Sequence, residues 1–371
     1  MENKIIEICN SILFESSQAD LIALEGWGKK EWKNALEFCS FQGLVPLLSS
    51  VFNDIKKIDV SAKEVVLEWY GLAETIKNKY RNKIGIMREM ALLFQDDGID
   101  IMFLKGATLS SLYPKPEWRT FSDIDYYLYG QHQEGVNVLE KHGIITEEYE
   151  HHHTQASYKG VLIENHYDFF DCVNHKCNLI LEKYMKDLAQ SEGRTMRYYF
   201  GDSRVHNAYC MSPTMNAIFL MRHMSAHFVA ETIPLRMVYD WSLFQMRYAN
   251  RVDWERVIDL YAKTGMILFA ENIQYILMHY LKVPVTKSPI TPSSRYAKQI
   301  WESIFIKPRI NPYKKYGLLF NLVETRTFFK NRWKHKIVYQ NESYLKLFFS
   351  YVFLTFKRKL GLLNHVTHEL I

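Results

Sequence analysis

Two aspartates separated by a single residue lie in a segment with the composition of a β-strand. Asp123 and Asp125 flank Ile124, and residues 126–129 continue the strand with packing residues. Because side chains alternate between the faces of a strand, both carboxylates would project to the same side. Two like charges this close are unfavourable unless a cation neutralises them, and Mg²⁺ binds carboxylate oxygens while leaving positions for phosphate oxygens. The alternative is an exposed strand end with two solvated acids.

A second polar strand is predicted downstream, at residues 161–168. Glu164, His166 and Asp168 share one face of this strand, opposite a largely apolar face. In two-metal phosphoryl chemistry, a third acid helps to hold the catalytic metal and often activates the attacking hydroxyl. We assign this role to Glu164, with Asp168 as the alternative, and we expect His166 to orient a carboxylate or the acceptor. A half-buried strand with a solvated polar face would show the same pattern.

Residues that suit phosphate groups precede the two aspartates. Lys105 and Gly106 lie at a predicted strand-to-helix junction, where glycine lets a ligand approach the backbone and the helix N-terminus attracts phosphate. The Lys105 ammonium would add a cation to a triphosphate. Arg119 lies four residues before Asp123, and a guanidinium there suits a charged phosphate group. The alternative for Arg119 is a surface salt bridge.

The hydrophobic pattern predicts the elements that would position these residues. The first 80 residues are predicted to be helical, and later helices begin at Ser212 and Pro213, a cap followed by a first-turn proline, and after Pro234. Between these helical segments, strands and helices are mixed. The predicted strands are residues 99–104, 123–129, 155–158 and 161–168, and the predicted helices there are residues 76–94, 107–113 and 131–142.

These elements indicate an α+β fold, in which a small mixed-sheet core is inserted between mostly helical N- and C-terminal regions. The C-terminal region is basic, because residues 301–371 hold 13 Lys and Arg residues but only 4 acidic residues. That asymmetry fits either a polyanionic partner or a solvated basic face. The predicted regions are a helical N-terminal region (1–80), the α/β core (81–205), a helical region (206–300) and the basic, helical C-terminal region (301–371).

The order of the motifs resembles that of the uncharacterised bacterial nucleotidyltransferase family within the DNA polymerase β superfamily. The chain is also similar to the toxin-type nucleotidyltransferases of abortive-infection and toxin–antitoxin systems, which pair a Lys-Gly segment with an Arg and an Asp-x-Asp strand. The resemblance covers roughly residues 80–250. It rests on residues 103–107 (FLKGA), 113–114 (YP), Arg119, 122–125 (SDID) and 163–166 (IENH).

The resemblance implies an enzyme that binds a nucleoside triphosphate, such as ATP, with Mg²⁺ or Mn²⁺. It would transfer a nucleoside monophosphate to the hydroxyl of an acceptor, which could be a sugar, a protein side chain or an RNA end. The residues assigned to the metal are Asp123, Asp125 and Glu164, with His166 completing the catalytic set. The residues assigned to the nucleotide are Lys105, Gly106, Arg119 and Ser122. One departure from the broader superfamily is Ala107 after Gly106, where Ser or Gly is usual, and another is the sixteen residues between Gly106 and Asp123.

Two other functions fit the same motifs. One is a toxin-like enzyme that nucleotidylates tRNA, for which the basic C-terminal region would contact RNA. The other is a non-catalytic nucleotide-binding or partner-binding protein that keeps the fold. The third carboxylate discriminates between catalysis and binding alone, because catalysis becomes doubtful if Glu164 and Asp168 both point away from Asp123 and Asp125.

The predicted helix after Pro213 carries two histidines at positions that share one helix face. His223 and His227 have the i, i+4 spacing that can share a metal ion. Met224 stands where a zinc protease would have its glutamate, which excludes that class. The resemblance implies an accessory role near the nucleotide for these histidines and for Asp240, which follows Arg236. The alternative is a pair of histidines hydrogen-bonded to their neighbours.

Three other segments are given structural interpretations. Residues 147–153 (EEYEHHH) are interpreted as a solvated strand end rather than a metal site. The basic aromatic stretch at residues 328–336 is interpreted as packing plus a solvated face, with RNA binding as the alternative. The apolar run at residues 347–356 has about half of the roughly 20 residues that a membrane-spanning helix needs, so we predict a buried helix there.

The overall composition is that of a globular protein. Hydrophobic residues make up 48% of the chain and charged residues 23%, which excludes a disordered chain. The five cysteines are odd in number and form no Cys-x-x-Cys pair, so a complete disulfide framework is not expected. The first residues include acids where a signal peptide needs basic residues. We therefore expect a cytoplasmic protein.

Overall fold

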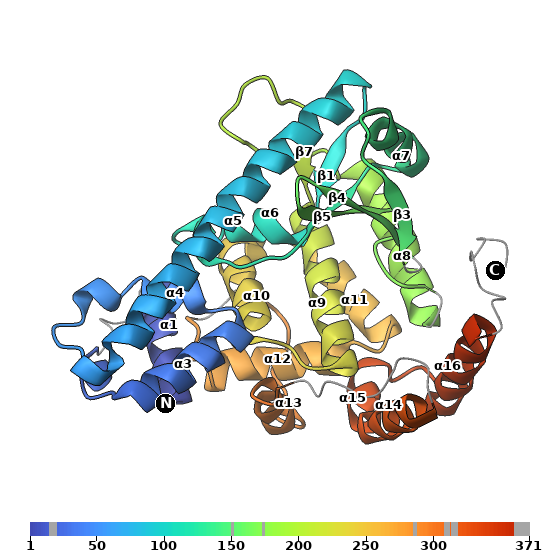
Figure 1. Ribbon diagram of the computed structural model, residues 1–371. Helices are drawn as coiled ribbons and strands as arrows, with labels where there is room; N and C mark the ends of the chain where they lie inside the picture. The colour runs from blue at the N-terminus through green and yellow to red at the C-terminus, as the bar shows by residue number, and fades with distance from the viewer. Residues whose placement is uncertain are drawn as a thin grey trace.

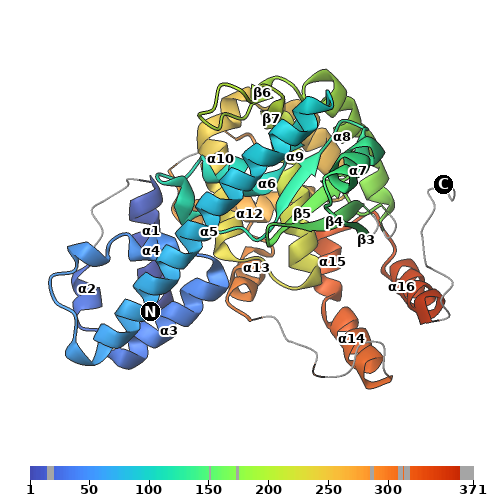
Figure 2. The ribbon, with the colours of Figure 1, turned by 45° about the horizontal axis from the view of Figure 1, so that its top comes forward.

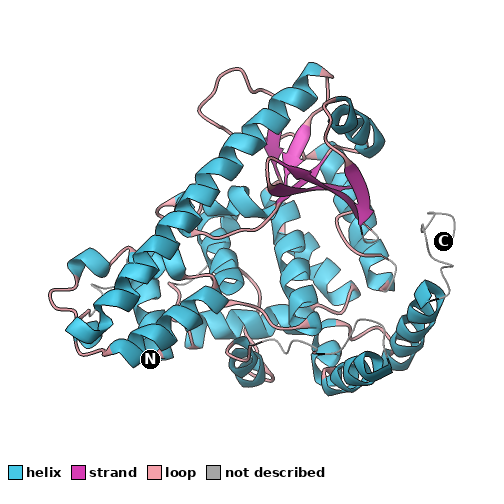
Figure 3. Ribbon diagram, viewed as in Figure 1, coloured by secondary structure: helices cyan, strands magenta, loops and turns pink. Residues whose placement is uncertain are grey.

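A computed structural model of the chain describes residues 1–14, 21–149, 152–172, 175–284, 288–307, 312 and 318–359. Within these residues, the strands gather into one mixed sheet and helices surround it (Figure 3). This arrangement confirms the predicted fold class, a small sheet combined with flanking helical regions. Helices α9 to α12 (residues 213–279), from the later part of the chain, lie on one side of the sheet (Figure 1).

The described α-helices and strands fall into four groups, of which the strands and the helices between them alternate along the chain. The N-terminal helices are α1 (Glu2–Phe14), α2 (Ile22–Glu25), α3 (Lys29–Gln42), α4 (Val45–Ser49) and α5 (Lys63–Asp96). The strands are β1 (Ile101–Phe103), β2 (Ile124–Tyr127), β3 (Thr146–Tyr149), β4 (His153–Tyr158), β5 (Val161–His166), β6 (Met196–Arg197) and β7 (Ala208–Cys210). Helices α6 (Lys105–Ser110), α7 (His132–Lys141) and α8 (Lys176–Ser191) lie between strands. The later helices are α9 (Pro213–Ala230), α10 (Leu235–Tyr248), α11 (Trp254–Lys263), α12 (Ile267–His279), α13 (Ala297–Ile304), α14 (Leu318–Lys330), α15 (Arg332–Val338) and α16 (Tyr344–Lys359).

The sheet has the strand order β3-β4-β5-β2-β1-β7-β6. The two pairs β2–β5 and β1–β7 are parallel, and the other pairs are antiparallel. Strand β2 lies at the centre, and its register with β5 places Asp125 opposite Glu164. Successive residues of β2 face opposite sides of the sheet, so Tyr126 joins one hydrophobic core and Tyr127 joins the other.

Helix α5 connects these two cores. Its first half packs Trp69 among the N-terminal helices, and its second half packs Phe94 against the sheet, where the Phe94 and Tyr126 rings are 5.6 Å apart. Figures 1 and 2 both show the helix running from the N-terminal helices to the sheet. The helix begins at Lys63, earlier than the predicted start at residue 76, and it continues without interruption through residue 80.

The helical region beyond the sheet is organised around α9. Its predicted start is confirmed, because the Ser212 hydroxyl accepts a hydrogen bond from the Met215 amide and Pro213 occupies the first turn. Helix α9 contacts α8, α10, α11 and α15, and its side chains are buried on most sides. It is therefore the central helix of this region. It begins directly after β7, so it connects the sheet to the later helices.

The remaining strand predictions differ from the structure mainly in length. Residues 99–104 and 123–129 contain the shorter strands β1 and β2, and the predicted hairpin corresponds to β4 and β5. The strands β6 and β7 have no counterpart in the predictions, since two or three residues are too few to show an alternating pattern. Because β7 ends at Cys210, the sheet extends past residue 205.

The prediction of a buried helix at residues 347–356 is wrong for the side chains that the structure describes. The segment lies in α16, where Phe349 is 66% exposed and Phe353 is 56% exposed. Within this helix, Phe348 contacts Phe328 of α14. Among the described helices, none combines the length and apolar character needed to cross a membrane.

The hydrophobic core that contains Phe94 and Tyr126 can be tested at Phe94, which is fully buried. We expect Phe94→Ala to lower the free energy of unfolding by about 3–5 kcal/mol, because it removes a large side chain and leaves a cavity. Leu67→Ala on the same helix is the control; Leu67 is 72% exposed, so the change should stay within about 0.5 kcal/mol. Urea unfolding of both variants measures the difference, and equal effects would contradict this description of the core.

The pH dependence of stability can be tested at His335, which is buried between Tyr339 and Phe328. Burial lowers the pKa of His335 to about 4, and the nearby His175 adds to this effect. The unfolded chain binds the proton below pH 6.5, whereas the folded chain stays neutral, so acid favours unfolding. Between pH 6.5 and 5, this single group should cost up to about 2 kcal/mol of stability.

His335→Phe is the matched variant for this test, because it keeps the ring and removes the titration. Its unfolding free energy should fall less between pH 6.5 and 5 than that of the unchanged chain, when both are measured by denaturant unfolding at several pH values. Identical pH profiles would show that His335 titrates normally in the folded protein.

Candidate active site

The central feature of the site is a group of acids on the two middle strands. Asp125 on β2 and Glu164 on β5 are direct neighbours in the parallel register, and only 2% and 8% of their surfaces are exposed. Asp123 lies immediately before β2, two residues from Asp125. Burial and then repulsion from Asp125 raise the pKa of Asp123, with a further contribution from Glu164. The three predicted acids therefore form one electrostatic cluster.

A lysine and a histidine stabilise the Asp125 carboxylate. Its Oδ1 lies 2.8 Å from Lys105 Nζ and 3.1 Å from His166 Nε2. Burial alone would raise the pKa of Asp125, but Lys105 and His166 together lower it, so this carboxyl stays ionised. The pKa of His166 is raised in return: burial opposes the shift, and hydrogen bonds to Asp125 and Glu164 cause it. The other oxygen of Asp125, Oδ2, is buried without a hydrogen-bond partner.

The position of Lys105 depends on the backbone at Gly106. Gly106 has φ 44° and ψ −114°, which lies in a region that favours glycine, and a Cβ there would meet the Phe121 ring at 3.3 Å. The end of β1 is tied to β2 because the Leu104 amide donates to the Asp125 carbonyl at 2.9 Å. The turn after β1 therefore delivers Lys105 to the acids on the neighbouring strand.

The two candidates for the third carboxylate have different surroundings. Glu164 Oε1 accepts a hydrogen bond of 2.7 Å from Gln155 and stays beside Asp125. Asp168 lies beyond the end of β5, where its carboxylate is bound to Lys186. The geometry favours Glu164 over Asp168 for a role with Asp125.

A cluster of three histidines adjoins the acids. The ring centre of His166 is 5.4 Å from that of His152 and 5.1 Å from that of His153. Burial lowers the pKa of His152 to about 2 and that of His153 to about 4, so both are neutral near pH 7. The interpretation of residues 147–153 as a solvated strand end is thus wrong for His153, which is 5% exposed. The sequence signal was the histidine run itself, but its burial depends on pairing between β4 and β5.

Two overlapping sets of side chains have the spacing of metal ligands. One consists of Asp125, Glu164 and His166, and the other of His152, His153 and His166. Within each set the ligand atoms lie within 4.8 Å of one another. Carboxylate oxygens suit Mg²⁺ and Mn²⁺, so the first set is the better match for the ion that the sequence predicts.

Arg119 is buried, so the surface salt bridge considered from the sequence is wrong. Its guanidinium donates to both oxygens of Asp240 at 2.8 Å and to the Gly106 carbonyl at 2.9 Å. Tyr113 also donates to Asp240, at 2.8 Å. Every guanidinium nitrogen of Arg119 is therefore engaged by the protein, and the side chain holds the Gly106 turn to helix α10.

A cavity of about 160 Å³ lies between Asp123, the Gly106 turn and the helices α9 and α10. Arg236 lines it and lies 3.6 Å from Asp240, and 23% of its side chain is exposed. The sequence pattern gave no role to Arg236, although its guanidinium makes fewer contacts than that of Arg119. His223 and His227 line the same cavity, with ring centres 4.6 Å apart, and burial lowers the pKa of His223 well below its usual value. Ser122 is an exposed member of the lining beside Asp123.

A lysine on α5 also contributes to the site. Lys83 is buried, donates to the Phe121 carbonyl and lies 4.7 Å over the Phe121 ring. Burial lowers the pKa of Lys83, and the charge of Asp123 opposes that shift. No local pattern in the sequence marks this lysine, because its partner lies on a loop 38 residues away.

Comparison with known proteins identifies one family. The family model described as uncharacterised nucleotidyltransferase matches residues 28–282, which is more than half of the chain. No curated protein and no solved structure matches the chain. The matched region includes every side chain of the acid cluster and of the adjoining cavity.

The pair Arg119–Asp240 predicts a large effect of Asp240→Asn. Both side chains are about 95% buried, so removing the carboxylate charge leaves a guanidinium without a counter-ion. We expect a loss of about 3–5 kcal/mol in the free energy of unfolding. Asp259→Asn is the control, because Asp259 pairs with Lys263 at the surface and should cost less than about 1 kcal/mol. A loss below 1 kcal/mol for Asp240→Asn, measured by urea unfolding, would show that this pair does not hold the turn.

Proposed function

Because the chain belongs to the uncharacterised nucleotidyltransferase family, we propose that it is a metal-dependent enzyme that transfers a nucleoside monophosphate from a nucleoside triphosphate to an acceptor hydroxyl. The observation that carries the proposal is the direct pairing of Asp125 with Glu164, with Asp123 beside them. Three acids at one point strongly repel one another. A site that binds a metal ion and phosphate groups explains why they are kept together.

The donor set fits a divalent ion. Asp125 Oδ2 is buried and without a partner, and it is adjacent to the Glu164 carboxylate. Asp125 and Glu164 would hold Mg²⁺ or Mn²⁺. Asp123, which is in neither set of closely spaced ligand atoms, would add a further carboxylate, and His166 keeps Asp125 oriented through its hydrogen bond to Oδ1. Such an ion, when bound, neutralises charge on phosphate oxygens and polarises the phosphorus that is attacked.

The phosphate groups of the nucleoside triphosphate would enter the cavity between Asp123 and α10, whose volume of about 160 Å³ is too small for the whole nucleotide. Lys105 and Arg236 supply positive charge to the lining of this cavity, which also includes Gly106. Ser122 adds a hydroxyl at the mouth. Arg119 acts indirectly in this scheme, because it positions the Gly106 turn.

The transfer step needs an acceptor hydroxyl in line with the leaving group. The hydroxyl oxygen forms a bond to the α-phosphorus, the bond from that phosphorus to the bridging α–β oxygen breaks, and the electron pair leaves with pyrophosphate. Glu164 would take the hydroxyl proton, the role that a third acid often has in such a site. Catalysis on this scheme comes mainly from positioning and charge neutralisation.

The non-catalytic alternative is less well supported. It would be favoured if neither Glu164 nor Asp168 lay beside Asp125, but Glu164 does. A toxin-like enzyme acting on tRNA would use the same acids. This alternative therefore differs from the main proposal only in the acceptor. Sugar, protein and RNA hydroxyls all fit the proposed step.

Nucleotide binding is the first property to test. With Mg²⁺ or Mn²⁺, we expect one of the four nucleoside triphosphates to raise the melting temperature by several degrees, since a ligand at 100 times its Kd adds about 2.7 kcal/mol of stability. Asp123→Asn/Asp125→Asn should abolish the rise because the metal carboxylates are gone. Thermal shift on the full chain measures both.

The matched control is Asp187→Asn, an exposed aspartate on α8 that lies outside the cavity. It should keep the full metal-dependent rise. No rise with any nucleotide in the folded, unchanged chain, or an equal rise in the double variant, would refute the proposed triphosphate site.

A further inference from the structure

A second cavity, of about 300 Å³, adjoins the active site on the side of α8 and α15. Its lining includes Arg222, which is 1% exposed, and all three guanidinium nitrogens of this arginine lack a hydrogen-bond partner. The guanidinium carbon lies 4.3 Å from the centre of the Tyr339 ring, which covers one face of the group. A buried, permanently charged group with five unused N–H donors is costly unless something binds to it.

The carboxylates near Arg222 do not satisfy these donors. Glu342 accepts hydrogen bonds from His175 Nδ1 at 2.7 Å and from the Cys177 amide at 2.9 Å, so both of its oxygens are engaged elsewhere. Asp171 lies in the lining of the cavity and forms no hydrogen bond with Arg222. The hydrogen-bonding capacity of Arg222 is therefore not used by these acids.

A second unsatisfied group lines the same cavity. The Nδ1 atom of His152 is buried and has no hydrogen-bond partner. Two independent unsatisfied side chains, from α9 and from the turn before β4, therefore meet around one space. This arrangement is expected of a binding site whose ligand supplies the acceptors.

The cavity lies next to the catalytic acids. The His152 ring is 5.4 Å from the His166 ring, and His166 is bonded to Asp125. On the other side, His223 lines both this cavity and the cavity proposed for the nucleotide. A ligand held at Arg222 could thus present a group to the site of transfer, as an acceptor must.

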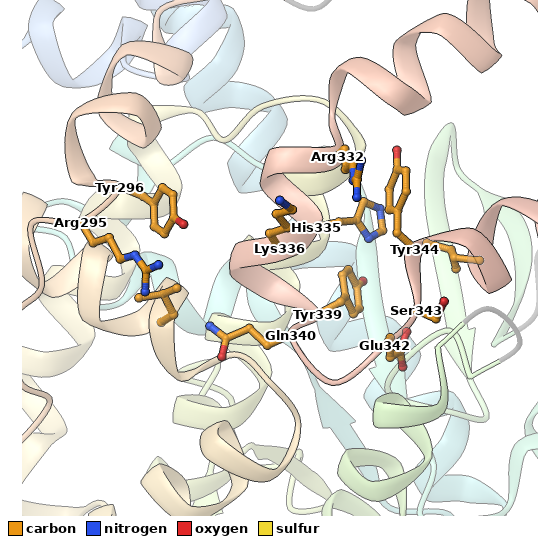
Figure 4. A pocket seen from close by; sticks show the side chains of 12 residues that line it. Arg295, Tyr296, Arg332, His335, Lys336, Tyr339, Gln340, Glu342, Ser343 and Tyr344 are labelled. Atoms are coloured by element: carbon orange, nitrogen blue, oxygen red, sulfur yellow. The ribbon is translucent and has the colours of Figure 1, made fainter.

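The charge outside the cavity also favours an anion. Tyr339 lines a larger groove of about 490 Å³, in which Figure 4 shows Arg295 on the opposite side from Arg332 and Lys336. None of these three described cations has an ion-pair partner. Cations along a groove attract negative ligands and raise their local concentration.

We propose that the Arg222 cavity binds the phosphate group of a small acceptor substrate, a hydroxyl compound that carries a phosphate. This inference rests on the proposed function and names the class of its second substrate. A guanidinium fork matches two oxygens of a phosphate, and His152 is placed to add a donor from its Nδ1. The cavity volume of about 300 Å³ equals the lower limit for small-molecule sites. Aromatic side chains such as Phe219 line the cavity.

The test measures binding of inorganic phosphate to the full chain by calorimetry, without nucleotide. Arg222→Lys keeps the charge but removes the fork, and we expect it to weaken phosphate binding about ten-fold or more. Arg247→Lys, an exposed arginine on α10, should leave binding within about two-fold. His152→Phe keeps a ring and removes the donor, and should also weaken binding.

Arg222→Met separates a ligand-binding arginine from a structural one. If the guanidinium has no partner in the free protein, this variant should melt no lower than the unchanged chain and should no longer be stabilised by phosphate. A structural arginine would instead cause a large drop in melting temperature. The metal-dependent stabilisation by nucleoside triphosphate should persist in both Arg222 variants, so failure of the acceptor site is distinguishable from failure of the proposed function.

Three outcomes would overturn the proposal. The first is unchanged phosphate affinity in Arg222→Lys. The second is loss of phosphate binding in Arg236→Lys with full binding in Arg222→Lys, which would mean that phosphate binds only at the nucleotide cavity. The third is Arg222-dependent binding of a short single-stranded RNA without any binding of free phosphate, which would replace the small acceptor with an RNA end.

Discussion

The site depends on the buried negative charge of Asp125. A carboxylate that is 98% removed from solvent must be compensated, and Lys105 and His166 compensate it from two different elements. Lys105 reaches it because Gly106 permits the turn after β1, and His166 reaches it because β5 pairs in parallel with β2. Glu164 adds a second acid through the same pairing. The strand order therefore brings two acids, a lysine and a histidine together.

A second constraint joins this sheet to the helical region. The Arg119–Asp240 pair fixes the segment between α6 and β2 against α10, with Gly106 held by the same guanidinium. Arg236 then lies one helical turn from Asp240 and shares a cavity with Asp123. Neither the sheet nor the helices alone form this cavity. The extent of the family match, which covers the sheet and α9 to α12 together, agrees with a site built from both.

Buried polar groups lie between the sheet and the helical region, among them His152, His153 and Arg222. His152 and His153 stay neutral beside the acids because burial lowers the pKa of each. Arg222 is charged but without hydrogen-bond partners, which gives the second cavity a different character from the first. The two cavities share His223 on α9. In the proposed function, one cavity would take phosphate groups of the donor and the other would take the acceptor. A transferase needs such an arrangement, because donor and acceptor must meet.

Local patterns in the sequence determined the alternation of Asp123 and Asp125, the helix start at Ser212, the glycine turn after Lys105 and the mixture of a small sheet with helices. These features depend on strand periodicity, capping and backbone preference, all of which act over a few residues. Only the tertiary structure decided that Glu164 and not Asp168 faces Asp125, that Arg119 is bound by Asp240, that His152 and His153 adjoin the acids, and that α16 exposes Phe349. Strand register, burial and ion pairs join residues that are far apart in the sequence; Arg119 and Asp240 are 121 positions apart. No short-range pattern contains that information, because the free energy of each contact depends on what the rest of the chain places beside it.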